Sequence, residues 1–158
     1  MYRRHRIFSV VVFVVVFVLC FLFKIDYKRI SETAISVVSI ALAVYISASS
    51  VLLGSGFAKK LKTSKDEQVT TKTQLGVLST YLRFAGGFGI ATIMFSVWYI
   101  SDVDMSFIVN WLSEIGCNNL IPFMSLTLSS LSCGVFAVNL LFIWLILIFL
   151  INAMAKSV

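Results

Sequence analysis

Four long apolar runs, separated by shorter polar segments, dominate the pattern of hydrophobic and polar residues along the chain. They cover about residues 7–23, 34–57, 82–100 and 133–153. Each is close to the roughly 20 apolar residues that a helix needs to cross the hydrocarbon core of a bilayer. The pattern therefore predicts an all-α polytopic membrane protein, with residues 1–158 forming a single membrane domain of four transmembrane helices.

The composition agrees with this prediction. The sequence is 59% hydrophobic and its mean hydropathy is +1.00, whereas soluble domains are about 45–50% apolar. Four membrane spans leave no room in a chain of 158 residues for a separate soluble catalytic domain.

The charged residues predict how the four spans are oriented. If the N-terminus is cytosolic, ten lysines and arginines lie inside and three outside, which gives net charges of +8 and −2. Cytosolic segments of membrane proteins carry this excess of basic residues. We therefore expect both termini in the cytosol and a multi-pass protein of the bacterial inner (plasma) membrane. The basic cytosolic loop, residues 58–74, contains Lys59, Lys60, Lys62, Lys65 and Lys72.

Small residues line one side of the second span. At about 100° per residue they fall within an arc of about 80°. We call this set the serine seam: Ser36, Ser39, Ala43, Ser47, Ser50 and Gly54. The third span has a second small face within about 60° of arc, formed by Ala85, Gly89, Thr92 and Ser96.

Small residues let two helix backbones approach closely, so the two faces are candidates to pack against each other. In the alternative, one face closes the monomer and the other faces an axis shared by several copies, where serines line a pore. The sequence leaves packing and conduction open, and two such faces on one small chain favour a homo-oligomer.

The segment predicted to lie outside, residues 101–132, is weakly acidic. Residues 105–116 have the spacing of a short helix in the membrane interface, and we expect residues 125–132 to project outward or bend. Asn139 is the one strongly polar side chain well inside the last span, and we expect it to hydrogen-bond a neighbouring helix or to line a conduction path. Whether Cys117 and Cys133 form a disulfide is open.

The groups that catalysis needs are missing from the predicted spans. The only histidine, His5, lies in the basic N-terminal tail, where we expect it to be solvated. No cluster has metal-ligand spacing, and no Asp, Glu, Lys or Arg lies deep in a span as a proton-coupling group. We therefore expect no enzyme activity, no metal and no cofactor. The lysines of loop 58–74 and Arg83 are expected to contact anionic membrane lipids, or an anionic nucleotide or oligonucleotide.

The overall plan resembles the small four-helix membrane effectors of bacterial anti-phage, abortive-infection systems. The resemblance covers the basic start, the short outer connector, the weakly acidic outer segment and the basic loop after KIDYKRISETAISVVSIALAVYISASSVLLGSGFAKKLK. It implies an oligomeric ion channel that depolarises the inner membrane and is controlled by a cytosolic regulatory protein. The basic loop and Arg83 would then receive the cytosolic signal. A phage holin and a non-conducting membrane anchor or assembly subunit are the alternatives.

Overall fold

The protein folds as a bundle of long helices. The computed structural model describes residues 2–54, 62–63, 73–101 and 120–155. Four helices in this part of the chain are long and apolar enough to cross a membrane, which confirms the four-helix prediction. The predicted interfacial helix at 105–116 lies outside the described residues. The helices are α1 (Arg3–Leu22), α2 (Lys28–Gly54), α4 (Gln74–Ile100) and α6 (Leu120–Ala155).

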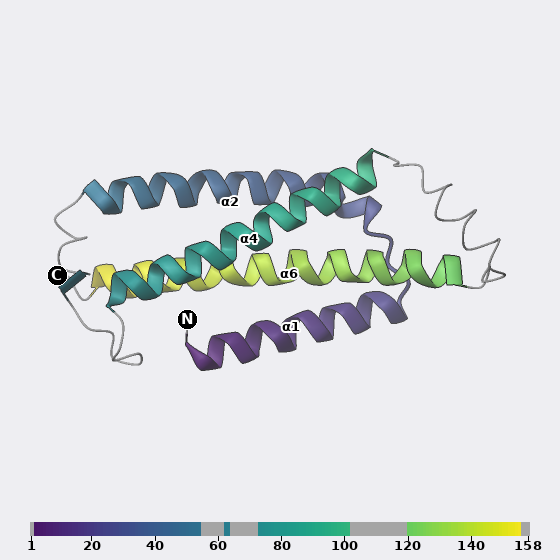
Figure 1. The fold of residues 1–158 in the computed structure, drawn as a ribbon, viewed down its shortest axis with the longest axis horizontal. Helices are drawn as coiled ribbons and strands as arrows, with labels where there is room; N and C mark the ends of the chain where they lie inside the picture. Colours follow the sequence, from purple (N-terminus) through teal and green to yellow (C-terminus); the bar gives the residue numbers. More distant parts are fainter. Residues whose placement is uncertain (1, 55–61, 64–72, 102–119, 156–158) are drawn as a thin grey trace.

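Helix α6 is the centre of the bundle and contacts each of the other three helices. Helix α1 packs along α6, whereas α2 packs mainly on α4, which crosses the bundle obliquely (Figure 1). Helices α1 and α4 begin at the end of the bundle where α2 and α6 finish (Figure 1). We call this the basic end, after Arg4 and Arg6 of α1, and the opposite end the connector end.

Two local interactions at the connector end explain where α1 stops and α2 starts. Lys24 has a positive φ of 51°, a left-handed conformation that ends the helix and is costly for a residue with a Cβ. The amide of Ile25 then donates to the carbonyl of Cys20 at 3.0 Å. Asp26 accepts from the amide of Lys28 at 3.0 Å and so caps α2. The second helix consequently begins at Lys28, before the apolar run at residue 34.

Hydrogen bonds hold the connector between α1 and α2, residues 23–27, against α6 and α4. The hydroxyl of Ser129 donates to the carbonyl of Ile25 at 2.9 Å and accepts from the amide of Tyr27 at 2.7 Å. The hydroxyls of Tyr27 and Ser96 share a further hydrogen bond of 2.8 Å. Burial raises the pKa of Tyr27, so its phenol stays neutral. These contacts join α6, the connector and α4 at one point.

Replacing Ser129 by alanine is expected to lower the free energy of unfolding by about 1–3 kcal/mol, because the buried amide of Tyr27 and the part-buried carbonyl of Ile25 lose their partner. Ser125→Ala is the matched control, since Ser125 is exposed on the same helix. Thermal unfolding in detergent measures both variants. Equal midpoints for the two would contradict the anchoring role of Ser129.

The last helix is continuous, and three of its four serines lie inside the bundle. Helix α6 runs unbroken over 36 residues, and Ser129, Ser130 and Ser132 are buried. The hydroxyls of Ser130 and Ser132 donate to carbonyls one turn earlier on α6. The helix therefore does not break at residues 125–132, and these three serines are buried in the bundle. That this part projects beyond the membrane on the outer side stays a prediction.

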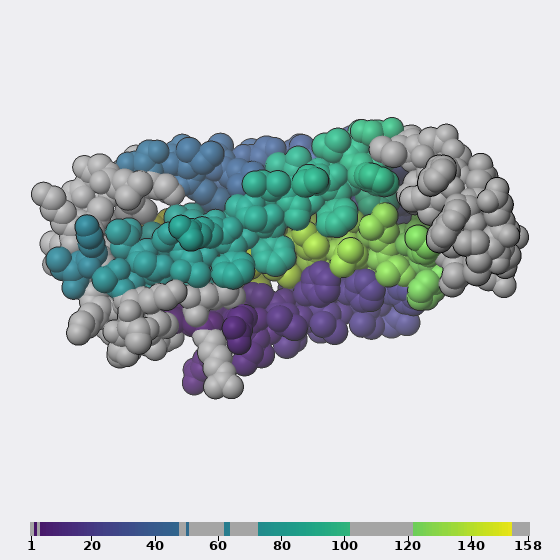
Figure 2. Space-filling view, in the orientation of Figure 1, coloured from purple at the N-terminus to yellow at the C-terminus, as the bar shows by residue number. Residues whose placement is uncertain are grey.

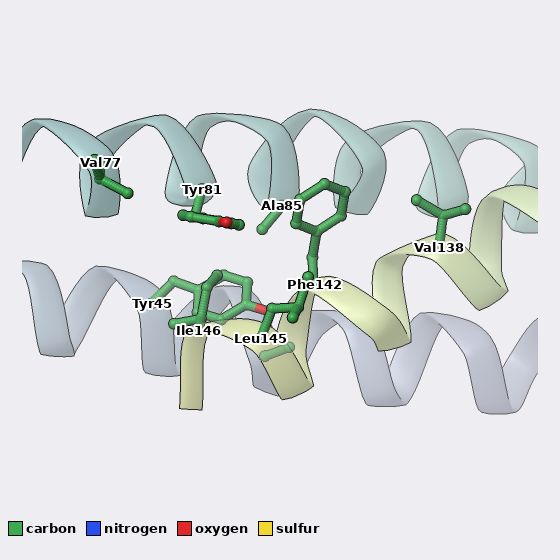
Figure 3. Close-up of a cluster of buried hydrophobic side chains, with 9 residues drawn as sticks. Tyr45, Val77, Tyr81, Ala85, Val138, Phe142, Leu145 and Ile146 are labelled. Carbon is green, nitrogen blue, oxygen red and sulfur yellow. The ribbon is translucent and has the colours of Figure 1, made fainter. Parts of the chain in front are cut away.

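The basic half of the bundle encloses a tightly packed apolar core. Tyr81 of α4 and Phe142 of α6 are each 1% exposed, and their rings meet edge-on with centroids 6.4 Å apart. Phe88 stacks on Phe142 from a later turn of α4. Tyr45 of α2 and Ile146 of α6 complete this core on the opposite side (Figure 3). Aromatic rings thus fill the space between three helices.

Candidate functional site

The serine seam lies on the outside of the bundle. Its described members are exposed, whereas Val38, Ala41 and Tyr45 on the opposite side of α2 are buried. Helix α2 runs along one edge of the molecule, and α1 along the opposite edge (Figure 2). The exposed members are Ser36, Ser39, Ala43, Ser47 and Ser50, while Gly54 is the last residue of α2. The seam therefore faces whatever surrounds the monomer.

The hydroxyls of the seam are partly satisfied within α2 itself. Ser36 donates to the carbonyl of Glu32, and Ser50 to the carbonyl of Ile46, each at 3.0 Å. Such bonds occupy the hydroxyl proton and leave the oxygen lone pairs free to accept. The seam is thus a strip of small side chains that presents hydrogen-bond acceptors without charge.

The second small face has the opposite placement, inside the bundle. Its members Ala85, Gly89, Thr92 and Ser96 are all buried. A Cβ on Gly89 would lie 3.2 Å from Leu42 and 3.3 Å from Val38, both on α2. The expected meeting of the two small faces is therefore wrong: the α4 face packs against the Val38 side of α2, and the seam points away from it. Large side chains of α2 fit onto the small residues of α4.

Asn139 is enclosed in the bundle, and among the described residues its side chain has no hydrogen-bond partner. It is 1% exposed, and neither its amide nitrogen nor its carbonyl oxygen bonds any group in the part of the chain that the structure describes. The predicted hydrogen bond to a neighbouring helix is absent there. The side chain lies within the bundle, one residue after buried Val138, and so does not belong to the outward-facing seam.

Replacing Asn139 by leucine is expected to raise the free energy of unfolding by about 2 kcal/mol, because a buried amide without partners is costly and leucine has a similar volume. Asn152→Leu serves as the control, because Asn152 is exposed near the end of the same helix. Detergent thermal denaturation reports the difference. A destabilised Asn139→Leu protein would instead mean that the amide is satisfied in the folded state.

The basic residues are only partly described. Lys62 and Arg83 are exposed, so both are accessible to an anionic group. Lys59, Lys60, Lys65 and Lys72 lie outside the described residues. Arg83 lies inside α4 and is followed by an uncharged run, residues 84–100, which places it at one boundary of the apolar part of that helix.

His5 is not a solvated tail residue, contrary to prediction. It is half-buried, and its Nδ1 shares a hydrogen bond of 2.5 Å with the hydroxyl of Tyr81. The amide of Tyr2 donates to the same hydroxyl at 3.3 Å. The start of α1 is therefore attached to α4 at the basic end. This contact could not be predicted from the sequence, because Tyr81 lies just before the apolar run that begins at residue 82 and no pattern links it to the N-terminal tail.

Two cysteines meet in the half of the bundle near the connector. Cys20 of α1 and Cys133 of α6 are both buried free thiols and belong to one cluster with Tyr27 and Ala34. Cys117, the other candidate partner of Cys133, lies outside the described residues. The described residues contain no group of three or more His, Cys, Asp or Glu side chains that could bind a metal ion together.

No protein-family model, curated protein or solved structure matches the chain. The candidate site therefore rests on the geometry of the helices: an outward serine seam on α2, a filled interior, and exposed Lys62 and Arg83.

Proposed function

We propose that the protein is an oligomeric inner-membrane channel in which the serine seams of several copies surround the conduction path. The observation that carries the proposal is the outward placement of the seam on a bundle whose interior is filled. An ion path through a single copy would have to displace Phe142 and Tyr81, each 1% exposed. A path between copies needs no such displacement.

The seam has properties suited to such a path. Its small side chains leave width along a shared axis, and free oxygen lone pairs can replace part of an ion's hydration shell. Because the described seam contains no charge, it would discriminate weakly between small cations and anions. In a cyclic oligomer each copy contributes the same surface to the axis, and in the described part of the chain exposed serines follow the length of α2.

Control from the cytosol follows from the position of the charges. Exposed Lys62 and Arg83 belong to the side that the positive-inside rule assigns to the cytosol. A cytosolic regulatory protein or an anionic nucleotide or oligonucleotide contacts them there and changes the fraction of open channels. Together with the resemblance to abortive-infection effectors, this predicts a membrane-depolarising protein of anti-phage defence.

The proposal is tested by stoichiometry and conductance measured on the same preparation. Mass measurement of the detergent-purified protein is expected to give a closed oligomer, and planar bilayers containing it are expected to show discrete currents. A monomer that gives no current would overturn the proposal. Escape of a folded cytosolic enzyme from expressing cells would favour a holin, because a serine-lined ring passes small ions only.

A further inference from the structure

We propose that His5 and Tyr81 form a proton-sensitive latch, which holds the start of α1 against α4 while His5 is neutral and releases it when His5 is protonated. His5 comes before the apolar run that begins at residue 7 and lies at the basic end of the bundle. It is the only histidine of the chain, so no other imidazole titrates in the same pH range. This inference does not depend on conduction, since it concerns the attachment of α1 and not the seam.

Three aromatic side chains meet where α1 begins. The ring centroid of His5 lies 5.8 Å from that of Tyr81 and 5.2 Å from that of Tyr2. Tyr81 is 1% exposed, and its ring packs against those of Phe142 and Phe149 of α6. In the described part of the chain α1 packs along α6 and not along α4. These side chains therefore join the start of α1 to a helix that it does not otherwise pack along.

The hydrogen bonds at this point suit a neutral His5. The Tyr81 hydroxyl accepts from the amide of Tyr2 at 3.3 Å and shares a hydrogen bond of 2.5 Å with Nδ1 of His5. The phenol carries one proton, and the unprotonated nitrogen of a neutral imidazole can accept it. We therefore assign the donor role to Tyr81 and the acceptor role to Nδ1, which puts the imidazole proton of neutral His5 on Nε2. An imidazolium has protons on both nitrogens and cannot accept.

The charges around His5 also favour its neutral form. Burial, and then the positive charge of the N-terminus, lower the pKa of His5 below its ordinary value of 6.5. Arg4 and Arg6 flank it on α1, α4 carries Arg83 two residues after the latch tyrosine, and the described part of α6 has no charged residue. The described carboxylates lie at the opposite, connector end: Asp26 and Glu32. A proton on His5 therefore meets no compensating carboxylate among the described residues.

Protonation consequently weakens the attachment. Because the pKa of His5 is lowered while α1 is attached, the released state binds the proton more readily, and a fall in pH favours release. The attachment is fully present above the ordinary pKa of 6.5 and is lost as the pH falls through the lowered pKa of His5. The positive-inside rule assigns the basic end to the cytosol. The latch therefore responds to acidification of the cytosol.

The proton positions are tested by nitrogen NMR of protein that carries isotope-labelled histidine and is purified without a histidine tag, so that it contains one imidazole. Neutral His5 is expected to carry its proton on Nε2. Tyr81→Phe removes the hydroxyl but keeps the ring, and is expected to raise the pKa of His5. Tyr45→Phe is the control, because the Tyr45 hydroxyl bonds no described group, and it is expected to leave that pKa unchanged. A proton on Nδ1 of the neutral imidazole would overturn the proposal.

Release of α1 is measured by hydrogen exchange of the amides of residues 6–10, compared between variants at one pH so that intrinsic exchange rates cancel. At about pH 5 the parent protein is expected to exchange about tenfold faster than His5→Gln, whose amide oxygen can accept from Tyr81 and whose side chain never becomes charged. At about pH 7.5 the two are expected to exchange alike, and His5→Lys about tenfold faster than either.

Two results of the exchange experiment would contradict the latch. Equal exchange of the parent and His5→Gln at the lower pH would mean that protonation of His5 does not release α1. An equal rise in exchange over α6 would mean that the whole protein unfolds in acid. A rise confined to the start of α1 supports the proposal.

Discussion

Replacing Ser47 and Ser50 together by leucine is expected to abolish conductance while leaving the protein inserted in the membrane. Both residues are exposed on α2, so larger side chains are accommodated without disturbing the monomer. In a ring built around the seam, however, leucines narrow the path and remove its hydrogen-bond acceptors, and an apolar constriction closes a pore by dewetting. Planar-bilayer currents and membrane depolarisation in expressing cells measure the effect.

The control for this experiment changes two serines outside the seam. Ser79 of α4 and Ser125 of α6 are also exposed, so the double variant Ser79→Leu and Ser125→Leu adds the same apolar volume elsewhere. It is expected to conduct like the parent. If the Ser47 and Ser50 variant carries full current, the seam does not line the path. If both double variants lose current, the loss is caused by adding leucine anywhere on the surface and does not depend on the seam.

Replacing Gly89 by leucine is expected to lower the free energy of unfolding by about 3 kcal/mol, at the upper end of the range for overpacked interiors. Even the first carbon of the new side chain would lie 3.2 Å from Leu42 and 3.3 Å from Val38. The remaining atoms must push α2 away from α4. Unfolding by heat or by increasing SDS in mixed micelles provides the measurement.

Gly87 provides a matched control on the same helix. It is exposed, and a Cβ there would meet nothing within 4 Å. Gly87→Leu is therefore expected to be neutral or to stabilise the protein by up to about 1 kcal/mol, because leucine has the higher helix propensity. Similar losses at both positions would mean that helix α4 does not pack closely on α2 at Gly89.

The resemblance to abortive-infection effectors and the channel proposal rest on different observations. The resemblance comes from the order of basic, apolar and acidic segments, whereas the channel comes from the outward seam on α2. The stoichiometry and conductance experiments test the second without the first. A conducting oligomer with no effect on phage growth would support the channel proposal and contradict the proposed role in defence.

Much of the candidate site could be read from the sequence, but its orientation could not. The spacing of Ser36 to Ser50 identified the seam, and the spacing of Ala85 to Ser96 identified the second small face. The sequence did not predict which of these two sets of small residues points into the bundle, because lipid chains are as apolar as the core. A small face suits both an interior contact and a contact with another copy.

The surroundings of His5 and Asn139 could not be predicted from the sequence either. A histidine next to arginines is expected in water, yet His5 shares a hydrogen bond with the hydroxyl of Tyr81, on a helix distant in sequence. An asparagine within a span is expected to find a partner, yet its amide forms no hydrogen bond with any described group of the neighbouring helices. Both outcomes depend on the side chains of other helices, which the periodicity of one helix does not report.

By itself the sequence determined four apolar helices, their order, and the two small faces, because length, hydropathy and helical spacing are local properties of the chain. The tertiary structure alone decided that α6 is central, that the Ala85 to Ser96 face receives the large side chains of α2, and that the serine seam points outward. It also created an apolar groove lined by residues of α2, α4 and α6. These features arise where three helices meet, and in a membrane that meeting is decided by the fit of side chains rather than by a difference in hydrophobicity.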